Sequence, residues 1–192
     1  MPNICAMTDE NADQRQRLFF ALWPDAEIQG ALAEHACQAL DRRRARRLPA
    51  ENLHITLAFL GEVDADTRAC AEATAAGLSG EPFGLSIDRL GYWPQKNLLW
   101  AGPSTTPSAL ERLAADLGEA LASDCGFERE QRAFKAHLTL ARKVPKMPPR
   151  IAIEPVDWPV ERFVLVASET GPQGATYTIV GEWPLTGDTA SD

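Results

Sequence analysis

Apolar residues along the chain form two patterns, short runs of strand length and longer stripes of helical spacing. The short runs predict strands at residues 18–23, 53–61, 83–90, 97–101, 136–142, 160–167 and 175–180. Apolar positions three or four residues apart predict helices at 25–43, 64–78 and 107–123. Asp25 is placed to cap the first helix. The proline-rich segment 143–159 is expected to be an irregular loop.

This alternation of strands and helices favours an α+β fold with two sheet-bearing halves. We expect a disordered leader at residues 1–16, a single bilobal domain at 17–186 and a tail at 187–192. The chain of 192 residues is long enough to bury a substantial core. It contains no apolar run of membrane-spanning length, and its polar first residues lack a signal-peptide pattern.

One apolar run occurs twice and carries the same polar residues each time. The sequence HITLA begins at His54 and HLTLA begins at His137, so that two of the three histidines sit in one frame with Thr56 and Thr139. Because side chains alternate along a strand, each histidine shares a face with its threonine. The opposite face of the first strand would carry Ile55, Leu57 and Phe59. Two such strands facing one groove would offer two proton-transfer groups and two hydroxyl donors, a set suited to opening a phosphodiester.

The formal charge of −8 argues against a protein that coats long nucleic acid, although a small basic site is compatible with it. Arginines at positions 42, 43, 44, 46 and 47 follow the first predicted helix. They are either cations that favour a helix C-terminus or a patch that attracts phosphate near the first motif.

His35 is expected to be a packed or surface residue. The Trp and Tyr of residues 91–96, between two predicted strands, are core residues or a stacking surface for a base.

Four cysteines, at positions 5, 37, 70 and 125, are scattered without a C-x-x-C pair. Scattered cysteines of this kind are typical of reduced proteins. We therefore expect free thiols and a cytoplasmic location.

The two motifs resemble the 2H phosphoesterase superfamily, which is named for two H-x-[ST] motifs. Within it, the chain is similar to the bacterial RNA 2′,3′-cyclic phosphodiesterases, also called 2′-5′ RNA ligase-like proteins. The similarity is carried by residues 17–21, 51–62 and 134–142, and more weakly by 165–168 and 174–177. The family commonly has proline before the second histidine, where this chain has Ala136.

The resemblance implies a bilobal fold with a cleft between two antiparallel-rich sheets, no cofactor or metal, and hydrolysis of a terminal 2′,3′-cyclic phosphate to a 2′-phosphomonoester. It assigns His54 as proton donor to the leaving O3′ and His137 as the base on water. Thr56 and Thr139 become donors to the phosphate oxygens. The expected partners are RNA 3′ ends or small cyclic nucleotides, with the protein a monomer and no membrane involved. Further candidate substrate or phosphate contacts are Arg47, Arg142, Phe134 and Tyr177.

Several alternatives remain at this point. The chain could be a non-catalytic module that binds RNA ends, or a reversible 2′-5′ RNA ligase. A metal hydrolase using the two histidines with carboxylates is disfavoured, because H-x-H and H-E-x-x-H spacings are absent from the sequence. In the last alternative, both histidines are core residues bonded to neighbouring threonines.

Overall fold

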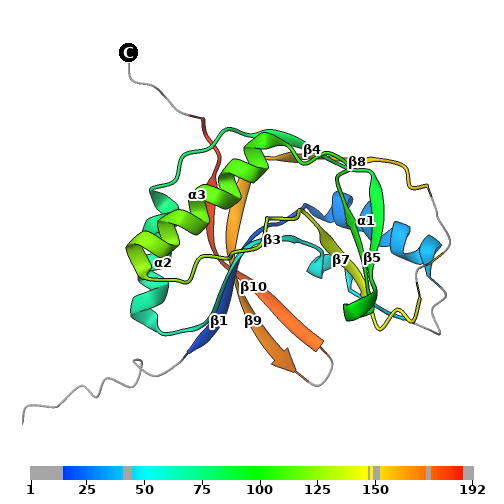
Figure 1. Cartoon of the computed structure of the whole chain (residues 1–192), viewed down its shortest axis with the longest axis horizontal. Coiled ribbons are helices and arrows are strands. Elements are labelled where there is room, and N and C mark those ends of the chain that lie inside the picture. Colours follow the sequence, from blue (N-terminus) through cyan, green and yellow to red (C-terminus); the bar gives the residue numbers. More distant parts are fainter. Residues whose placement is uncertain (1–14, 41–44, 147, 149–151, 172–173, 188–192) are drawn as a thin grey trace, which may run out of the picture.

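The computed structural model describes residues 15–40, 45–146, 148, 152–171 and 174–187 (Figure 1). Its helices are α1 (Ala26–Ala39), α2 (Ala65–Ala76) and α3 (Ser108–Cys125), with 3-10 turns η1 (Ala50–Asn52) and η2 (Pro94–Lys96). The strands are β1 (Gln16–Leu22), β2 (Arg46–Arg47), β3 (Ile55–Val63), β4 (Phe83–Ile87), β5 (Arg89–Trp93), β6 (Leu98–Gly102), β7 (Leu138–Arg142), β8 (Val156–Val160), β9 (Arg162–Gly171) and β10 (Gly174–Pro184).

The strands form two antiparallel sheets, so the predicted α+β fold is confirmed. The large sheet has the order β10-β9-β1-β3-β7-β6-β5, with β2 paired to β7, and the small sheet joins β4 to β8. Within the described residues, β3 and β7 are paired only at Ile55 and Leu138. The large sheet therefore has two arms that meet at this pair. We call β1, β3, β9 and β10 the first arm, and β2, β5, β6 and β7 the second arm.

Helices back both arms. Helices α2 and α3 pack on each other and contact β10 and β3, whereas α1 contacts β7 and β8 (Figure 1). The predicted stripe of α3 is confirmed, because Leu110, Leu113, Leu117 and Leu121 are all buried. Asp25 caps α1 as predicted, its carboxylate accepting from the Ile28 N–H at 2.9 Å. That helix ends at Ala39, earlier than expected, and buries His35.

Strand β1 is apolar on both faces, and the two faces serve different purposes. Leu18, Phe20 and Leu22 point into the main core between the sheet and the helices. Phe19 and Ala21 belong to a second, smaller buried cluster with Val164 and Val166 of β9. Trp23 and Tyr177 pack on this cluster from its edge. The residues of this second cluster lie on the face of the sheet that also carries the motif residues.

Two predicted elements differ from the structure. The strand expected at 83–90 is two strands, β4 and β5, which join different sheets. The partner of β4 is β8, which lies in the segment expected to be irregular. Pro159 suggested a loop, but a strand of a two-stranded sheet tolerates proline. The alternation of Val156, Trp158 and Val160 was the informative signal, and Trp158 and Val160 are buried.

Phe59 was expected on the buried face with Ile55 and Leu57, and this is wrong, since 70% of it is exposed. The register explains the difference. Ala21 pairs with Thr56 and Phe20 with Ala58, so Leu57 is an extra residue on β3. Such a β-bulge shifts the following side chains to the other face. Phe59 accordingly pairs with Phe19, with 5.8 Å between their ring centroids.

The expectation of free thiols is wrong for two of the cysteines. Cys70 of α2 and Cys125 at the end of α3 form a disulfide that links positions 55 apart. Spacing could not reveal it, because it depends on how α2 and α3 pack together. Cys37 is free and exposed, and Cys5 lies outside the described residues, as do most of the expected leader and tail.

Candidate active site

The two motifs meet where the arms of the large sheet join. His54 and Thr56 flank Ile55 on one strand, and His137 and Thr139 flank Leu138 on the other. Ile55 and Leu138 themselves are fully buried in the core. Because side chains alternate along strands, the flanking histidines and threonines occupy the opposite face. The structure thus brings all four predicted motif residues to one seam.

Both histidines are held in the same way. Nδ1 of His54 lies 2.8 Å from the Asn52 carbonyl oxygen, and Nδ1 of His137 lies 2.8 Å from the Lys135 carbonyl oxygen. In each case the carbonyl belongs to the residue two positions earlier. A carbonyl can only accept, so Nδ1–H is the donor and a neutral ring carries its lone pair on Nε2. Each ring is therefore oriented with Nε2 as the nitrogen available for proton transfer.

Aromatic rings of the first arm surround His54. Trp23 stacks on it with a centroid distance of 5.1 Å and an interplanar angle of 3°. Phe19 lies at 4.9 Å, and Tyr177 presents an edge at 5.2 Å. Tyr177 was a predicted substrate contact and stands at the site. Trp23 and Phe19 were not predicted, because apolar residues in a strand look alike whether they face a core or a site.

The second histidine has its own aromatic neighbour on the second arm. Trp93, at the end of β5, meets His137 edge-on at 4.5 Å. The ammonium groups of Lys96 and Lys135 lie 5.3 and 5.6 Å from the Trp93 centroid, within cation–π range. Of the two interpretations of the 91–96 aromatics, the structure therefore places Trp93 at the site. Tyr92 instead donates from its hydroxyl to the Val144 carbonyl at 2.8 Å.

Burial and neighbouring cations set the protonation of the two rings. Burial lowers the pKa of His54 from 6.5 to about 4, opposed by the bond to the Asn52 carbonyl, while His137, when it is protonated, and the positive charge of Arg142 lower it further. Burial also lowers the pKa of His137, again opposed by its carbonyl bond, and the charges of Lys96 and Lys135 add to the decrease. In the free protein both rings are neutral at pH 7. An anion between them would favour protonation.

The arginines that follow α1 divide into two groups. Residues 42–44 lie outside the described part of the chain. Arg46 and Arg47 form β2, pairing with Arg142 and Ala141, so these two do not cap a helix. The guanidinium of Arg46 reaches Gly174 on the other arm, where a Cβ would lie 2.8 Å from its nitrogen. The predicted contacts Arg47 and Arg142 thus lie on paired strands of the second arm, Arg47 opposite Ala141 and Arg142 opposite Arg46, with Arg142 exposed.

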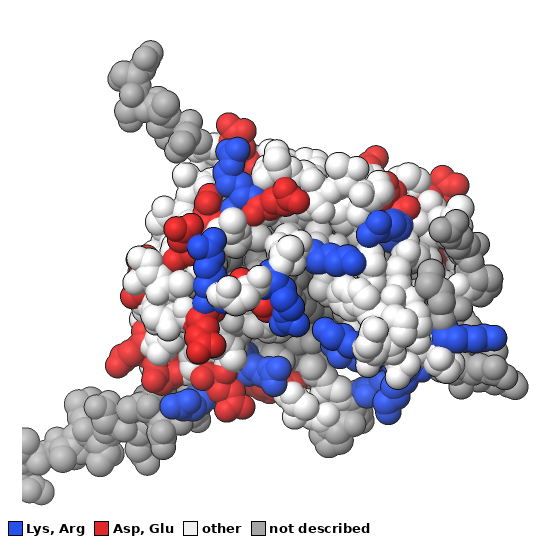
Figure 2. All heavy atoms as spheres, in the orientation of Figure 1, with Lys and Arg blue, Asp and Glu red and all other residues white. Residues whose placement is uncertain are grey.

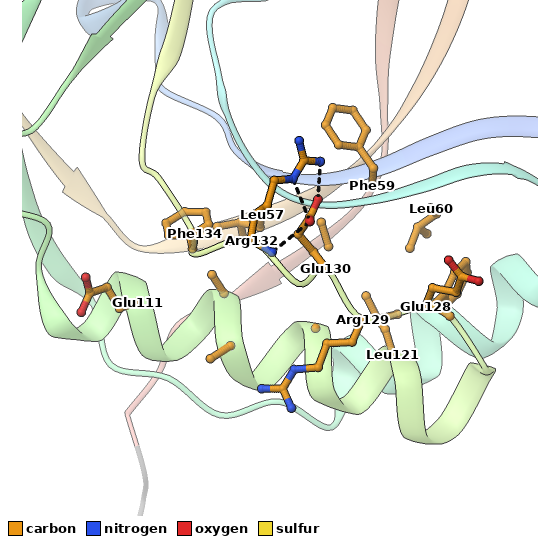
Figure 3. A pocket seen from close by; sticks show the side chains of 15 residues that line it. Leu57, Phe59, Leu60, Glu111, Leu121, Glu128, Arg129, Glu130, Arg132 and Phe134 are labelled. Atoms are coloured by element: carbon orange, nitrogen blue, oxygen red, sulfur yellow. Dashed lines mark hydrogen bonds and ion pairs between the residues drawn. The ribbon is translucent and has the colours of Figure 1, made fainter. Parts of the chain in front are cut away.

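Phe134, also a predicted substrate contact, lies elsewhere. It lines a cavity of about 250 Å³ between β3, α3 and residues 127–134 (Figure 3). Leu57 and Phe59 line the same cavity, and an ion pair of Arg132 with Glu130 at 2.8 Å lies at it (Figure 3). The Phe134 ring packs against the main core. Phe59 of this cavity also contacts Phe19, and Phe19 contacts His54, so the cavity adjoins the aromatic rings around the first histidine.

Across the described ranges, no group of three or more His, Cys, Asp or Glu residues is arranged to hold a metal ion. The metal-hydrolase alternative thus has no ligand set among these residues. No helix in the same ranges is long and apolar enough to cross a bilayer.

Comparison with known proteins places this arrangement in a family. The 2′-5′ RNA ligase superfamily matches residues 24–172. The chain belongs to that superfamily. Its relatives include the RNA 2′,3′-cyclic phosphodiesterase of Escherichia coli K12, which is 33% identical over 175 residues, or 89% of this chain and 97% of that protein. The enzyme of the same name from Thermus thermophilus is 32% identical over 184 residues, or 90% of this chain and 91% of that protein.

Solved structures agree with the fold over a similar extent. A crystal structure of a phosphoesterase superposes with a TM-score of 0.81 at 32% identity. The structure of E. coli LigT complexed with 3′-AMP gives 0.80 at 32% identity. Both comparisons cover 90% of this chain and 99% of the other chain.

Proposed function

We propose that this protein hydrolyses 2′,3′-cyclic phosphate ends of RNA or of small nucleotides, leaving 2′-phosphomonoesters. The observation that carries the proposal is the paired geometry of His54 and His137. Two imidazoles with the same backbone bond flank one residue pair, and their Nε2 atoms are available for proton transfer. Relatives named RNA 2′,3′-cyclic phosphodiesterase, covered over nearly their whole length, support the same activity.

In the proposed reaction, water attacks phosphorus as the bond from phosphorus to O3′ breaks. Nε2 of His137 takes the proton of the water, and Nε2 of His54 gives a proton to O3′. In-line displacement needs base and acid on opposite sides of phosphorus, which two histidines on different arms can supply. The hydroxyls of Thr56 and Thr139 donate to the phosphate oxygens as charge develops on them. The product carries a free 3′-hydroxyl and a 2′-phosphate.

The lowered pKa of His54 bears on its role as the acid. In the free protein its ring is neutral, so it must gain its proton when substrate binds. The negative charge of a cyclic phosphate beside Nε2 favours the protonated ring. Buried among Trp23, Phe19 and Tyr177, that imidazolium gives up its proton readily to a developing alkoxide. The neutral His137 is already in the form required of a base.

A second candidate is ligation, in which a 5′-hydroxyl of RNA replaces water and a 2′-5′ linkage forms. The match to the 2′-5′ RNA ligase superfamily favours testing it. Ligation would use the same two histidines in the same roles, with His137 taking the proton of the attacking hydroxyl and His54 giving a proton to O3′. Incubating RNA that ends in a cyclic phosphate with RNA bearing a 5′-hydroxyl, and sequencing the product linkage, separates ligation from hydrolysis.

We further propose that the protein works as a monomer without a cofactor. The Cys70–Cys125 disulfide removes the ground on which free thiols favoured a cytoplasmic location. The test of the whole proposal is a panel of nucleoside and oligonucleotide 2′,3′-cyclic phosphates, with products resolved as 2′- or 3′-phosphates. We expect 2′-phosphates, formed equally well in EDTA. Loss of turnover in EDTA that a divalent ion restores would contradict metal independence. Absence of turnover on every member of the panel would leave a non-catalytic RNA-end binder as the better account.

A further inference from the structure

A second polar site opens at the end of β7, beside the histidines. It is a hollow of about 570 Å³ lined by Lys96, Asn97, Arg142, Lys143 and Pro145. Three of these five residues are cations and none is a carboxylate, although the chain as a whole carries a charge of −8. On the face seen in Figure 2, Lys and Arg gather around the recessed middle, whereas Asp and Glu gather mainly over α2 and α3. The hollow is thus locally basic in an acidic protein, which favours an anionic ligand.

The backbone of this hollow is held in an unfavourable conformation at two positions. Asn97 and Lys143, with φ of 48° and 56°, are the non-glycine residues with positive φ in the described part of the chain. Asparagine tolerates this region, but lysine rarely adopts it. Two hydrogen bonds fix the conformation, from the Val144 N–H to the Asn97 carbonyl at 2.9 Å and from the Tyr92 hydroxyl to the Val144 carbonyl at 2.8 Å. Strain that the surroundings maintain in this way is concentrated at ligand sites.

The hollow adjoins the histidine site through Trp93. Lys96 lies over the ring of Trp93, and that ring contacts His137. The charge of Lys96 lowers the pKa of His137, and the charge of Arg142 lowers that of His54. The cations of the hollow therefore act on both proton-transfer groups. A strand whose 3′ end occupies the seam can reach the hollow with its adjoining residues.

We propose that this hollow binds a backbone phosphate of the RNA strand on the 5′ side of the cyclic end. The inference rests on the proposed function and extends it, since it makes the protein selective for oligonucleotide ends over single nucleosides. Lys96 and Lys143 supply the charge. Lys143 and the neighbouring Arg142 line the same hollow. A nucleoside 2′,3′-cyclic phosphate lacks the phosphate that these groups bind.

The first experiment compares two substrates in parallel. One is a nucleoside 2′,3′-cyclic phosphate, and the other is a five-nucleotide RNA with a 2′,3′-cyclic end. We expect Lys143→Gly to lower kcat/KM for the RNA by about five- to tenfold and to change it less than about twofold for the nucleoside. Arg112→Ala, which removes an exposed cation of α3, is the matched control and should change neither. Equal losses on both substrates, or none, would overturn the proposal.

A second comparison separates the charge of Lys143 from its backbone strain. Lys143→Gln removes the charge and keeps the strain, whereas Lys143→Gly removes both, because glycine adopts positive φ freely. We expect both variants to lose the preference for RNA, and Lys143→Gly to melt at the same or a higher temperature than the parent protein. Retention of the preference in Lys143→Gln would overturn the assignment of phosphate binding to the charge.

The third measurement does not depend on turnover. Fluorescence anisotropy follows binding of a five-nucleotide RNA that carries a dye at its 5′ end and a phosphate at its 3′ end. The slope of log Kd against log salt should fall by about one in Lys143→Gly, the change expected for one lost phosphate contact. A smaller slope in Lys143→Gly, found without any turnover by the parent protein, would support phosphate binding in the hollow and refute the proposed function. Turnover together with an unchanged slope would refute phosphate binding in the hollow and leave the proposed function standing. Failure of the parent protein to bind the RNA would also refute phosphate binding in the hollow.

Discussion

Ile55 and Leu138 form the backbone pair at which the two arms of the sheet meet, and each is flanked by the histidine and threonine of its motif. Both side chains are fully buried in the main core. Core packing at this one pair therefore fixes the mutual position of the four motif residues. The proposed reaction needs both copies of the H-x-T motif at this pair. Each copy supplies one histidine, and one histidine cannot be both the base and the acid of the same displacement.

The ring that stacks on His54 should control its pKa. Trp23→Ala removes a stacked neighbour and admits water, so the pKa of His54 should rise from about 4 towards 6.5. NMR titration of the imidazole protons measures this directly. Trp93→Ala is the matched control, because it exposes His137 and should raise the pKa of that ring instead. A His54 titration that is unchanged in Trp23→Ala would contradict the role given to burial.

The neutral, buried His54 should also make the fold sensitive to acid. In the unfolded chain its pKa is near 6.5, whereas in the folded protein it is about 4. Between these values the unfolded state binds the extra proton, so stability is present above pH 6.5 and is lost as the pH falls through 4. His54→Asn removes this contribution, and its melting temperature should fall less between pH 7.5 and 5. If the melting temperatures of the parent and the variant fell equally over this pH range, the link between protonation of His54 and stability would be refuted.

The Cys70–Cys125 disulfide should stabilise the packing of α2 on α3. Closing a loop between positions 55 apart is worth about 4 kcal/mol by the chain-entropy relation, which treats the unfolded chain as free of residual structure. The Cys70→Ser and Cys125→Ser double variant should therefore unfold at lower urea concentration than the oxidised protein. It should match the parent kept in a reductant. Cys37→Ser, at a free exposed thiol, is the control and should change little.

Gly91 makes room for the indole of Trp100. A Cβ at that position would lie 2.0 Å from the Trp100 ring, so Gly91→Ala must displace it. Trp100 in turn contacts Trp93, and Trp93 contacts His137. We expect a loss of about 1–3 kcal/mol in unfolding free energy, together with lower turnover. Gly118→Ala on α3 meets no atom within 4 Å and should instead be neutral or stabilising in the same denaturation assay.

Much of the fold could be predicted from local patterns. The leucine stripe of α3 and the cap at Asp25 are local signals, and the structure confirms both. The pairing of the motifs was also foreseeable, because both copies place a histidine and a threonine on the face opposite buried aliphatic residues. The leucine stripe and the cap depend on sequence neighbours only, whereas the meeting of the two motifs was inferred from their repetition.

Features that depend on distant contacts were missed. The bulge at Leu57 follows from pairing with β1, so the exposure of Phe59 could not be read from the alternation alone. The disulfide and the Trp23–His54 stack likewise join residues far apart in the chain. Strand β8 is a different case, because its signal was local. The alternation of Val156, Trp158 and Val160 is visible in the sequence, but the neighbouring prolines indicated a loop.

The threonines should matter less than the histidines. Thr56→Ala and Thr139→Ala each remove one hydroxyl donor to the phosphate oxygens. Each should lower kcat by about a hundredfold, the effect typical of a single oxyanion donor. Thr→Ser retains the hydroxyl and is the matched control, which should keep most of the activity. Steady-state kinetics on a nucleoside 2′,3′-cyclic phosphate would show equal losses in the Ala and Ser variants if the hydroxyls had no such role.

The division of labour between the histidines is the central claim, and a leaving-group comparison tests it most directly. His54→Ala and His137→Ala should each lower turnover by about two to four orders of magnitude, and the two losses should not add. A phosphodiester whose leaving group is more acidic than a ribose hydroxyl should restore turnover in His54→Ala, which lacks only the proton donor. It should not restore turnover in His137→Ala, which cannot activate water. Rescue of His137→Ala instead would reverse the assignment, and unchanged turnover in both variants would contradict a catalytic role for either ring.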